Sequence, residues 1–194
     1  YKFGIKRVHG LMGGGAAGLN DGFIKNGKIQ YICYHHEQSA GHSAVGESKF
    51  TGKLSVVNPT TGCGGTNCVT SVLNAWQDSV PVLFISGNVN KSTCTSFLNN
   101  KKKINLRSYG VQEHNIIDTI KSITKYSKFV ENVDEIPKVF DDAISSALSP
   151  RKGPVWIDIP SDVQNSIINF SKNSQIKFKT NKNKYFSNNK KKYS

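Results

Sequence analysis

Several features that define large classes of proteins are missing from this sequence of 194 residues. The longest apolar runs, such as residues 80–85, are far shorter than the roughly 20 residues that cross a bilayer as a helix, which excludes a membrane-spanning helix. Neither the Gly-Lys-Ser/Thr end of a P-loop nor the His-Glu-x-x-His spacing of a zinc protease occurs. With 37% hydrophobic and 20% charged residues, the chain fits one globular domain rather than a disordered chain or a coiled coil.

Cysteine is also scarce, and its spacing matches no known site. Cys33, Cys63, Cys68 and Cys94 include no Cys-x-x-Cys pair, and no pair of histidines completes a zinc pattern. A disulfide framework is not expected at this chain length and spacing. We therefore predict four reduced thiols in a cytoplasmic protein.

The positive charge is concentrated at one end of the chain. The formal net charge is +13, but residues 165–194 hold eight lysines and no acidic residue, which leaves 18 basic and 13 acidic residues in 1–164. We predict a domain at 1–164 and a Lys/Asn-rich linker or disordered tail at 165–194. Asn, Lys, Ile, Phe and Tyr are abundant throughout, as in an AT-rich coding sequence, so nucleic acid is not an expected partner. A basic binding protein that acts through its tail is the alternative.

Six short apolar stretches predict strands, because contiguous apolar runs suit a parallel sheet that is covered on both faces. They are residues 7–11, 30–33, 54–57, 81–86, 125–130 and 155–159. Apolar residues at helical spacing predict helices between most of them, at residues 37–50, 66–76, 113–123 and 136–148. This order predicts a doubly wound α/β domain with a mostly parallel six-stranded sheet and helices on both faces. Residues 88–109 show no clear period and are expected to form a long loop.

Ligands of such domains bind beyond the carboxyl ends of the strands, where three predicted loops gather. In the first, residues 11–16, three consecutive glycines let the backbone approach a ligand, but they match a dinucleotide-binding fingerprint only loosely. The second is residues 35–38. The third, residues 58–67, contains a glycine turn that opens a helix; it suits an anion, or it is a tight turn with Thr66 or Asn67 as the cap.

Glu37 follows an apolar strand directly and lies beside His35 and His36. A carboxylate that apolar groups cover can share a proton with a ligand nitrogen. The alternative is a first-turn glutamate that the helix dipole favours, with both histidines in structural roles. Spacing alone favours this second interpretation.

Several motifs that follow one another along the chain favour the first interpretation of Glu37, in which its carboxylate acts on a ligand. The segment YICYHHEQSA at 31–40 resembles the catalytic-glutamate segment of thiamine diphosphate enzymes of the acetolactate synthase type. The glycine loop before it is similar to that family, as are TTGCGGTN at 60–67, NAWQDSVPV at 74–82, VQE at 111–113 and GPVWIDIP at 153–160. The matches run from residue 4 to about residue 164. This region therefore resembles the N-terminal pyrimidine-binding (PYR) domain of such enzymes.

The resemblance implies an activity and a set of site residues. In the family, this domain holds the aminopyrimidine ring of the cofactor, and a glutamate, here Glu37, activates the cofactor by a hydrogen bond to a ring nitrogen. The implied reaction is the decarboxylation of a 2-oxo acid and carboligation to an acceptor, as in an acetolactate synthase-like transferase or lyase. The implied cofactor-binding residues are Gly13, Gly14, Glu37, Thr61, Gly62, Asn67 and Gln112.

The sequence holds only half of such a site. The family binds the diphosphate and Mg²⁺ through a separate domain with a Gly-Asp-Gly…Asn segment, which this sequence lacks. The resemblance thus implies thiamine diphosphate bound against the diphosphate-binding domain of another subunit, in a homodimer or homotetramer. Because the chain begins at Tyr1 rather than at methionine, we expect a fragment of a longer enzyme. A catalytically inactive PYR relative that serves as a partner or regulatory subunit is the alternative, and FAD binding and the identity of the 2-oxo acid stay open.

Four positions depart from the family pattern. The family usually has an aromatic residue at His9, a tyrosine at Glu47, an apolar residue at Pro59 and a proline at Cys63. These departures leave the substrate and the retention of activity open.

Small residues on one helix predict a close contact. The faces around residues 37–50 and 66–76 offer Ala40, Gly41, Ala44 and Gly46, which allow another helix to approach, and we expect this surface to be buried against another chain or domain.

Overall fold

The structure is a computed structural model that describes residues 3–168. The predicted tail at 165–194 therefore lies outside the described residues except for its first four. Within the described part of the chain, no helix has the length and apolar character needed to cross a bilayer.

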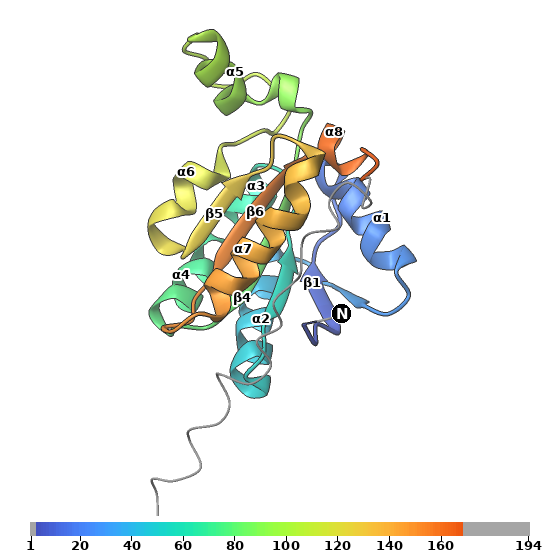
Figure 1. Cartoon of the computed structure of the whole chain (residues 1–194), viewed down its shortest axis with the longest axis vertical. Coiled ribbons are helices and arrows are strands. Elements are labelled where there is room, and N and C mark those ends of the chain that lie inside the picture. Colours follow the sequence, from blue (N-terminus) through green and yellow to red (C-terminus); the bar gives the residue numbers. More distant parts are fainter. Residues whose placement is uncertain (1–2, 169–194) are drawn as a thin grey trace, which may run out of the picture.

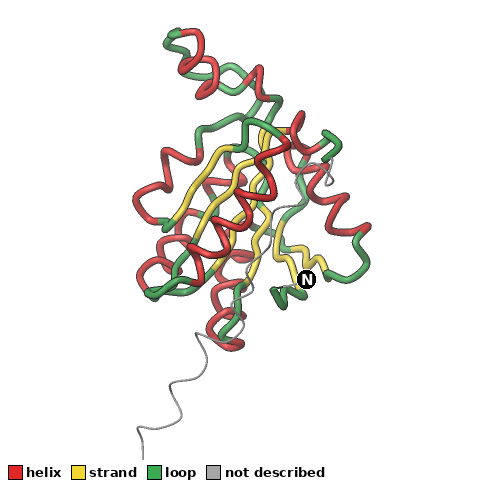
Figure 2. Tube along the Cα trace, viewed as in Figure 1, coloured by secondary structure: helices red, strands yellow, loops and turns green. Residues whose placement is uncertain are grey.

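A single sheet of six strands forms the centre of the molecule (Figure 2). The strands are β1 (Arg7–Gly10), β2 (Gln30–Cys33), β3 (Ser55–Asn58), β4 (Val82–Asn88), β5 (Tyr126–Phe129) and β6 (Val155–Pro160). Their order across the sheet is β2-β1-β3-β4-β6-β5, and every neighbouring pair is parallel. The predicted doubly wound α/β fold is confirmed, with a wholly rather than mostly parallel sheet.

Helices cover both faces of the sheet, with α1 and α7 on one side and α2 and α4 on the other (Figure 1). The helices are α1 (Ala17–Lys25), α2 (Glu37–Thr51), α3 (Cys63–Thr66), α4 (Val69–Gln77), α5 (Thr95–Lys102), α6 (Ile116–Ile120), α7 (Ile136–Leu148) and α8 (Ser161–Gln164). The predictions for α2 and α7 are confirmed to within one residue. The helix predicted at 66–76 starts later, at Val69, and the one predicted at 113–123 has only five α-helical residues. The predicted loop at 88–109 contains α5, which projects from the body of the domain.

Successive residues of the central strands point to opposite faces, and each face has its own apolar core. Leu83 and Ile85 of β4 pack beneath α7, whereas Phe84 packs beneath α2 and α4. Phe84 stacks on Trp156 of β6 with ring centroids 5.0 Å apart and planes inclined by 5°. Both rings are fully buried, so this pair lies at the centre of the second core.

The small residues of α2 contact this chain itself. Ala40 and Ala44 are fully buried in the second core, and a Cβ atom on Gly41 would overlap with Ser71 of α4. The expectation that this surface is buried against another chain is therefore wrong for these three residues, because α4 and the sheet already cover them. Gly46 faces open space.

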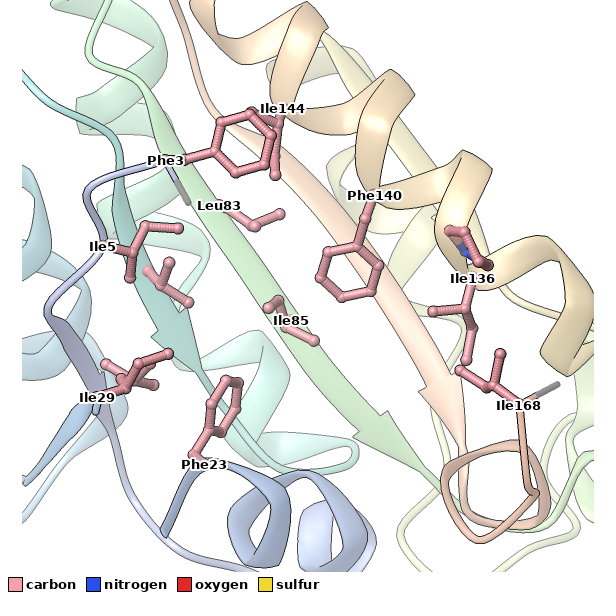
Figure 3. Close-up of a pocket in the computed structure, with 13 residues that line it drawn as sticks. Phe3, Ile5, Phe23, Ile29, Leu83, Ile85, Ile136, Phe140, Ile144 and Ile168 are labelled. Atoms are coloured by element: carbon pink, nitrogen blue, oxygen red, sulfur yellow. The ribbon is translucent and has the colours of Figure 1, made fainter. Parts of the chain in front are cut away.

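An apolar groove of about 390 Å³ lies on the other face, between α1 and α7 (Figure 3). Phe23 of α1, Phe140 of α7 and Ile85 of the sheet floor are among its lining residues, and Ile168 lies at its edge. Among residues 3–168, no titratable group lines this groove. It is therefore separate from the polar loops at the carboxyl edge of the sheet.

Candidate active site

The predicted loops meet at the carboxyl edge of the sheet, and their glycines make the meeting possible. A Cβ atom on Gly13 would lie 2.5 Å from Thr60 Oγ1, and one on Gly15 would overlap with Thr61 Oγ1. The Thr61 hydroxyl donates to the carbonyl of Gly87, at the end of β4, at 3.2 Å. The first and third predicted loops are thus packed against each other and against β4. Thr61 is a predicted cofactor-binding residue, and its hydroxyl donates this hydrogen bond within the chain.

A tight turn at Gly62 forms the centre of the third loop. Gly62 has φ 58° and ψ −115°, and the Gly64 N–H donates to the Thr61 carbonyl at 3.2 Å. These values fit the second residue of a type II′ turn, which requires glycine. A Cβ atom on Gly62 would overlap with the carbonyl oxygen of Gln112, so the turn touches the segment that carries this other predicted site residue.

Glu37 is the first residue of α2, and its side chain is buried. The Asn67 amide donates to Glu37 Oε2 at 2.9 Å. The other oxygen, Oε1, lies 3.0 Å from the place that a Cβ atom on Gly64 would occupy. One oxygen is therefore held by an amide, and the other faces a backbone without a side chain. His36 caps the helix instead, because its Nδ1 accepts the Gln38 N–H at 3.2 Å.

The surroundings of Glu37 are poorly solvated. The Cys68 thiol lies 3.6 Å from the Glu37 carbonyl oxygen. Burial and the negative charge of Glu37 raise the pKa of the Cys68 thiol, so it is neutral at physiological pH. Asn67 was predicted to be a cap or a cofactor ligand. It is not the N-cap of α4, which is Cys68; it lies at the C-cap of α3, and its amide holds the Glu37 carboxylate.

The remaining predicted site residues differ in what surrounds them. A Cβ atom on Gly14 would meet nothing within 4 Å, so this backbone borders open space. Gln112 has a φ of 60°, in the left-handed region, and its side chain is exposed. Sequence reasoning missed Thr60, which packs against Gly13 and against the position of a Cβ atom on Gly64. Its only signal was its place in the TTGCGGTN segment.

A buried polar network lies at the ends of β4 and β6, beside the Gly62 turn. Asp158 is fully buried and accepts hydrogen bonds from Ser86 Oγ at 2.6 Å and Asn88 Nδ2 at 2.8 Å. The Trp156 indole N–H donates to Ser86 Oγ at 2.7 Å. Burial outweighs these hydrogen bonds and raises the pKa of Asp158 to about 7. Nothing in the sequence of the GPVWIDIP segment predicts that Asp158 is buried and accepts these hydrogen bonds.

Asp158→Asn should change how stability depends on pH. The folded chain holds a proton on Asp158 between its ordinary pKa of 3.8 and about 7, where the unfolded chain has lost it. Stability contributed by this proton is complete below the ordinary pKa and is lost as the pH rises to about 7. The variant lacks this titration. In urea unfolding, its free energy of unfolding relative to the wild type should therefore rise between pH 3.8 and about 7 and stay constant above that. Asp118→Asn, at an exposed ion pair, is the control and should follow the wild type. A constant difference between Asp158→Asn and the wild type at every pH would contradict this account.

Two of the four departures from the family pattern are in direct contact. His9 Nε2 lies 2.6 Å from Glu47 Oε2, and His9 Nδ1 lies 2.8 Å from the Tyr34 hydroxyl. Arg7 also pairs with Glu47, at 2.9 Å. Burial acts to raise the pKa of Glu47, but the hydrogen bonds from His9 and Arg7 outweigh it and lower that pKa. The two positions at which the resemblance implies an aromatic residue and a tyrosine thus hold a polar pair.

We expect these two departures to be energetically coupled. His9→Phe leaves Glu47 without its shortest contact, and Glu47→Tyr leaves Nε2 of the buried His9 imidazole without its partner, so each should cost about 1–3 kcal/mol. The double variant removes both polar partners and should be at least about 1 kcal/mol more stable than the sum of the single changes implies. Urea unfolding of the four proteins measures this difference. Additive costs would show that the two positions are independent.

The other two departures fit the local backbone. Cys63 is the first residue of α3, where the backbone N–H has no partner within the helix, so cysteine and proline are both compatible with this place. Pro59 follows β3, is buried, and its carbonyl accepts the Gly87 N–H at 3.3 Å. Both residues are thus compatible with the packing of the first and third predicted loops against each other.

The fold is a doubly wound α/β domain, and its glycine loops and Glu37 gather at the carboxyl edge of the sheet, the edge at which domains of this class bind ligands. Residues 1–124 match the family described as "Thiamine pyrophosphate enzyme, N-terminal TPP binding domain". The chain is 36% identical over 164 residues to the acetolactate synthase isozyme 1 large subunit of Escherichia coli K12, covering 84% of this chain and 27% of that protein. It is 34% identical over 163 residues to the acetolactate synthase large subunit of Corynebacterium glutamicum, covering 84% of this chain and 24% of that protein.

The chain therefore belongs to the thiamine pyrophosphate enzyme family and corresponds to its N-terminal domain. It spans about a quarter of the length of these curated relatives. A solved structure of a candidate thiamin diphosphate-dependent enzyme from Mycobacterium smegmatis matches with a TM-score of 0.71 and 24% identity, covering 84% of this chain and 29% of that one. That likeness supports the fold.

The residues present fit the pyrimidine half of thiamine diphosphate. A flat ring can approach the open backbone at Gly14, and Glu37 Oε1 faces the bare backbone of Gly64 rather than a partner side chain. Among residues 3–168, no group of three or more His, Cys, Asp or Glu side chains is placed to hold a metal ion. The described residues thus offer a carboxylate and glycine backbone.

Proposed function

We propose that this chain is the pyrimidine-binding half of a thiamine diphosphate-dependent enzyme that acts on a 2-oxo acid, in the manner of an acetolactate synthase. The observation that carries the proposal is the buried Glu37 carboxylate, with Oε2 held by Asn67 and Oε1 facing Gly64. The similarity to acetolactate synthase large subunits supports the substrate class.

Each residue then has a physical task. Glu37 shares a proton with a nitrogen of the pyrimidine ring, and the Asn67 amide keeps the carboxylate aimed at that nitrogen. The open backbone at Gly14 admits the ring, and Gly13 packs against Thr60 beside it. The Gly62 turn and the adjoining Gln112 complete the site. When bound, thiamine diphosphate supplies the electron sink for decarboxylation of the 2-oxo acid. Cys68, whose thiol contacts the Glu37 backbone carbonyl, belongs to the apolar core against which α2 packs.

The diphosphate and Mg²⁺ are assigned to the diphosphate-binding domain of another subunit, in a homodimer or homotetramer. Mg²⁺ in such sites is held by carboxylate, carbonyl and phosphate oxygens, for which the described residues provide no cluster. This proposal includes the domain boundary at residue 164, with the residues beyond it as the connection to the next domain.

A chimera tests the proposal. Residues 1–164 replace the matched region of the E. coli isozyme 1 large subunit, and calorimetry follows thiamine diphosphate binding in the presence of Mg²⁺. We expect the chimera to bind the cofactor at least about 100-fold more tightly than the 194-residue chain alone, because only the chimera has both half-sites. Micromolar binding by the chain alone would contradict the half-site assignment. A folded chimera that binds no cofactor would favour an inactive partner subunit instead.

A further inference from the structure

Pro59 occupies a position of the sheet that calls for a backbone donor. The Ser55 N–H donates to the Pro81 carbonyl at 3.4 Å, at the start of the parallel ladder between β3 and β4. The Gly87 N–H donates to the Pro59 carbonyl at 3.3 Å, so this ladder continues to residue 59. In such a ladder every second residue donates to the neighbouring strand, and the acceptor advances by two residues each time. Residue 59 would therefore donate to the Ile85 carbonyl, but proline has no N–H.

The side chain of Asn58 supplies the missing donor. Asn58 is fully buried at the end of β3, and its Nδ2 donates to the Ile85 carbonyl at 2.8 Å. A buried amide is unfavourable unless it is hydrogen-bonded, and a buried carbonyl that loses its donor is unfavourable for the same reason. The Asn58 amide thus takes the place of the N–H that a residue other than proline would have at position 59.

Tyr31 fixes the orientation of this amide. The Tyr31 hydroxyl donates to Asn58 Oδ1 at 3.2 Å, and it also lies 3.4 Å from Asn20 Oδ1 in α1. Burial raises the pKa of Tyr31, so the hydroxyl keeps its proton at physiological pH and acts as a donor. Because Oδ1 accepts from Tyr31, the Nδ2 of the same amide faces Ile85.

The third predicted loop begins directly after this contact. Thr60 and Thr61 follow Pro59 and pack against the first predicted loop. The Asn58 side chain therefore anchors the end of the strand from which the Gly62 turn departs.

We propose that Asn58 is a positioning residue: its amide replaces the ladder hydrogen bond that Pro59 cannot make, and so holds the third predicted loop on β4. Pro59 is one of the four positions that depart from the pattern implied by the resemblance, and Asn58 is its compensating partner. Only the purpose of the loop, which is to line the cofactor site, rests on the proposed function. The hydrogen-bond geometry belongs to this chain alone.

A double-mutant cycle on the full 194-residue chain tests this proposal. Asn58→Leu keeps the volume of the side chain but removes the donor, and urea unfolding should show the folding equilibrium constant reduced about 10- to 100-fold. In the Pro59→Val background, the N–H of residue 59 can donate to the Ile85 carbonyl, so the same change should cost at least about fivefold less. The Tyr31 hydroxyl loses the same acceptor in both backgrounds, so its contribution cancels. Equal losses in both backgrounds would overturn the proposal.

Hydrogen exchange separates positioning of the loop from a general loss of stability. The Thr66 N–H donates to the Gly62 carbonyl at 2.9 Å, so its exchange reports whether the loop opens. In Asn58→Leu, exchange at Thr66 should be accelerated at least about fivefold more than exchange in α7, and Pro59→Val should reverse this. Equal acceleration throughout the chain would overturn the positioning role.

Thr124→Val is the matched control. The buried Thr124 hydroxyl also donates to a backbone carbonyl, that of Ile120 at 3.0 Å, but it lies beside β5 at the edge of the sheet. Its cost should be the same with proline or valine at residue 59, and a cost that Pro59→Val also reduced would overturn the specific coupling to Asn58. If Pro59→Val does not fold, Pro59→Ala takes its place, since it restores the same N–H. None of these readouts needs the cofactor, so this proposal and the role of Glu37 can fail independently.

Discussion

Glu37→Gln in the chimera should slow hydrogen exchange at C2 of the bound thiazolium ring by ~10²–10⁴, the usual contribution of a general acid–base group. The amide has nearly the shape of the carboxylate but cannot share a proton with the pyrimidine nitrogen. Deuterium exchange followed by NMR measures the rate. The melting temperature should change little, because the variant keeps the volume of the side chain and removes no apolar packing.

Glu47→Gln is the matched control for this experiment. Glu47 lies on the same helix, but its carboxylate pairs with His9 and Arg7 rather than facing the glycine turn. Its exchange rate should stay within about threefold of the wild type, since it touches no proton of the reaction. A lowered melting point with unchanged exchange in Glu37→Gln would make Glu37 a structural residue.

Gly62→Ala should destabilise the chain by roughly 2–5 kcal/mol, a large share of the 5–15 kcal/mol of an ordinary domain. The added Cβ atom is strained at φ 58° and ψ −115°, and it overlaps with the Gln112 carbonyl oxygen, so the backbone of one loop must move. Urea unfolding measures the loss. In the chimera, the displaced Gln112 loop should weaken cofactor binding as well.

Gly14→Ala separates the two effects. A Cβ atom there meets nothing within 4 Å, so the free energy of unfolding should change by less than about 1 kcal/mol. If the backbone at Gly14 is the surface that admits the ring, cofactor affinity in the chimera should still fall. Equal losses of stability in Gly62→Ala and Gly14→Ala would contradict the packing of the third loop against Gln112.

The sequence allowed the sheet and two long helices to be predicted because their apolar residues repeat at clear intervals. In α7, Val139, Ala143 and Ala147 are buried on one face, and the prediction was correct at both ends. Helix α1 was missed because its nine residues include two glycines and polar Asn and Asp, which obscure its apolar side. Helix α5 was missed because only Thr95 and Leu98 of its eight residues are buried. The base of its segment is joined by the hydrogen bond from the Gly110 N–H to the Thr93 carbonyl, a contact that no local pattern reveals.

The candidate site was predictable as a set of loops, and its internal contacts were not. Parallel strands bring their carboxyl ends to one edge, so a sequence reading could gather Gly13, Glu37 and Gly62 there. The Asn67–Glu37 hydrogen bond and the Gly62–Gln112 contact depend on how three crossovers pack, which spacing does not encode. The pairing of His9 with Glu47 joins residues 38 positions apart and was visible only once the fold was known.

The most direct test of the central claim is a ¹⁵N NMR spectrum of thiamine diphosphate, labelled in its pyrimidine ring and bound to the chimera. If Glu37 shares a proton with a ring nitrogen, one ¹⁵N resonance should shift in Glu37→Gln and stay in place in Glu47→Gln. Identical spectra for the wild type and Glu37→Gln would show that this carboxylate does not contact the ring and would contradict the assignment of the site.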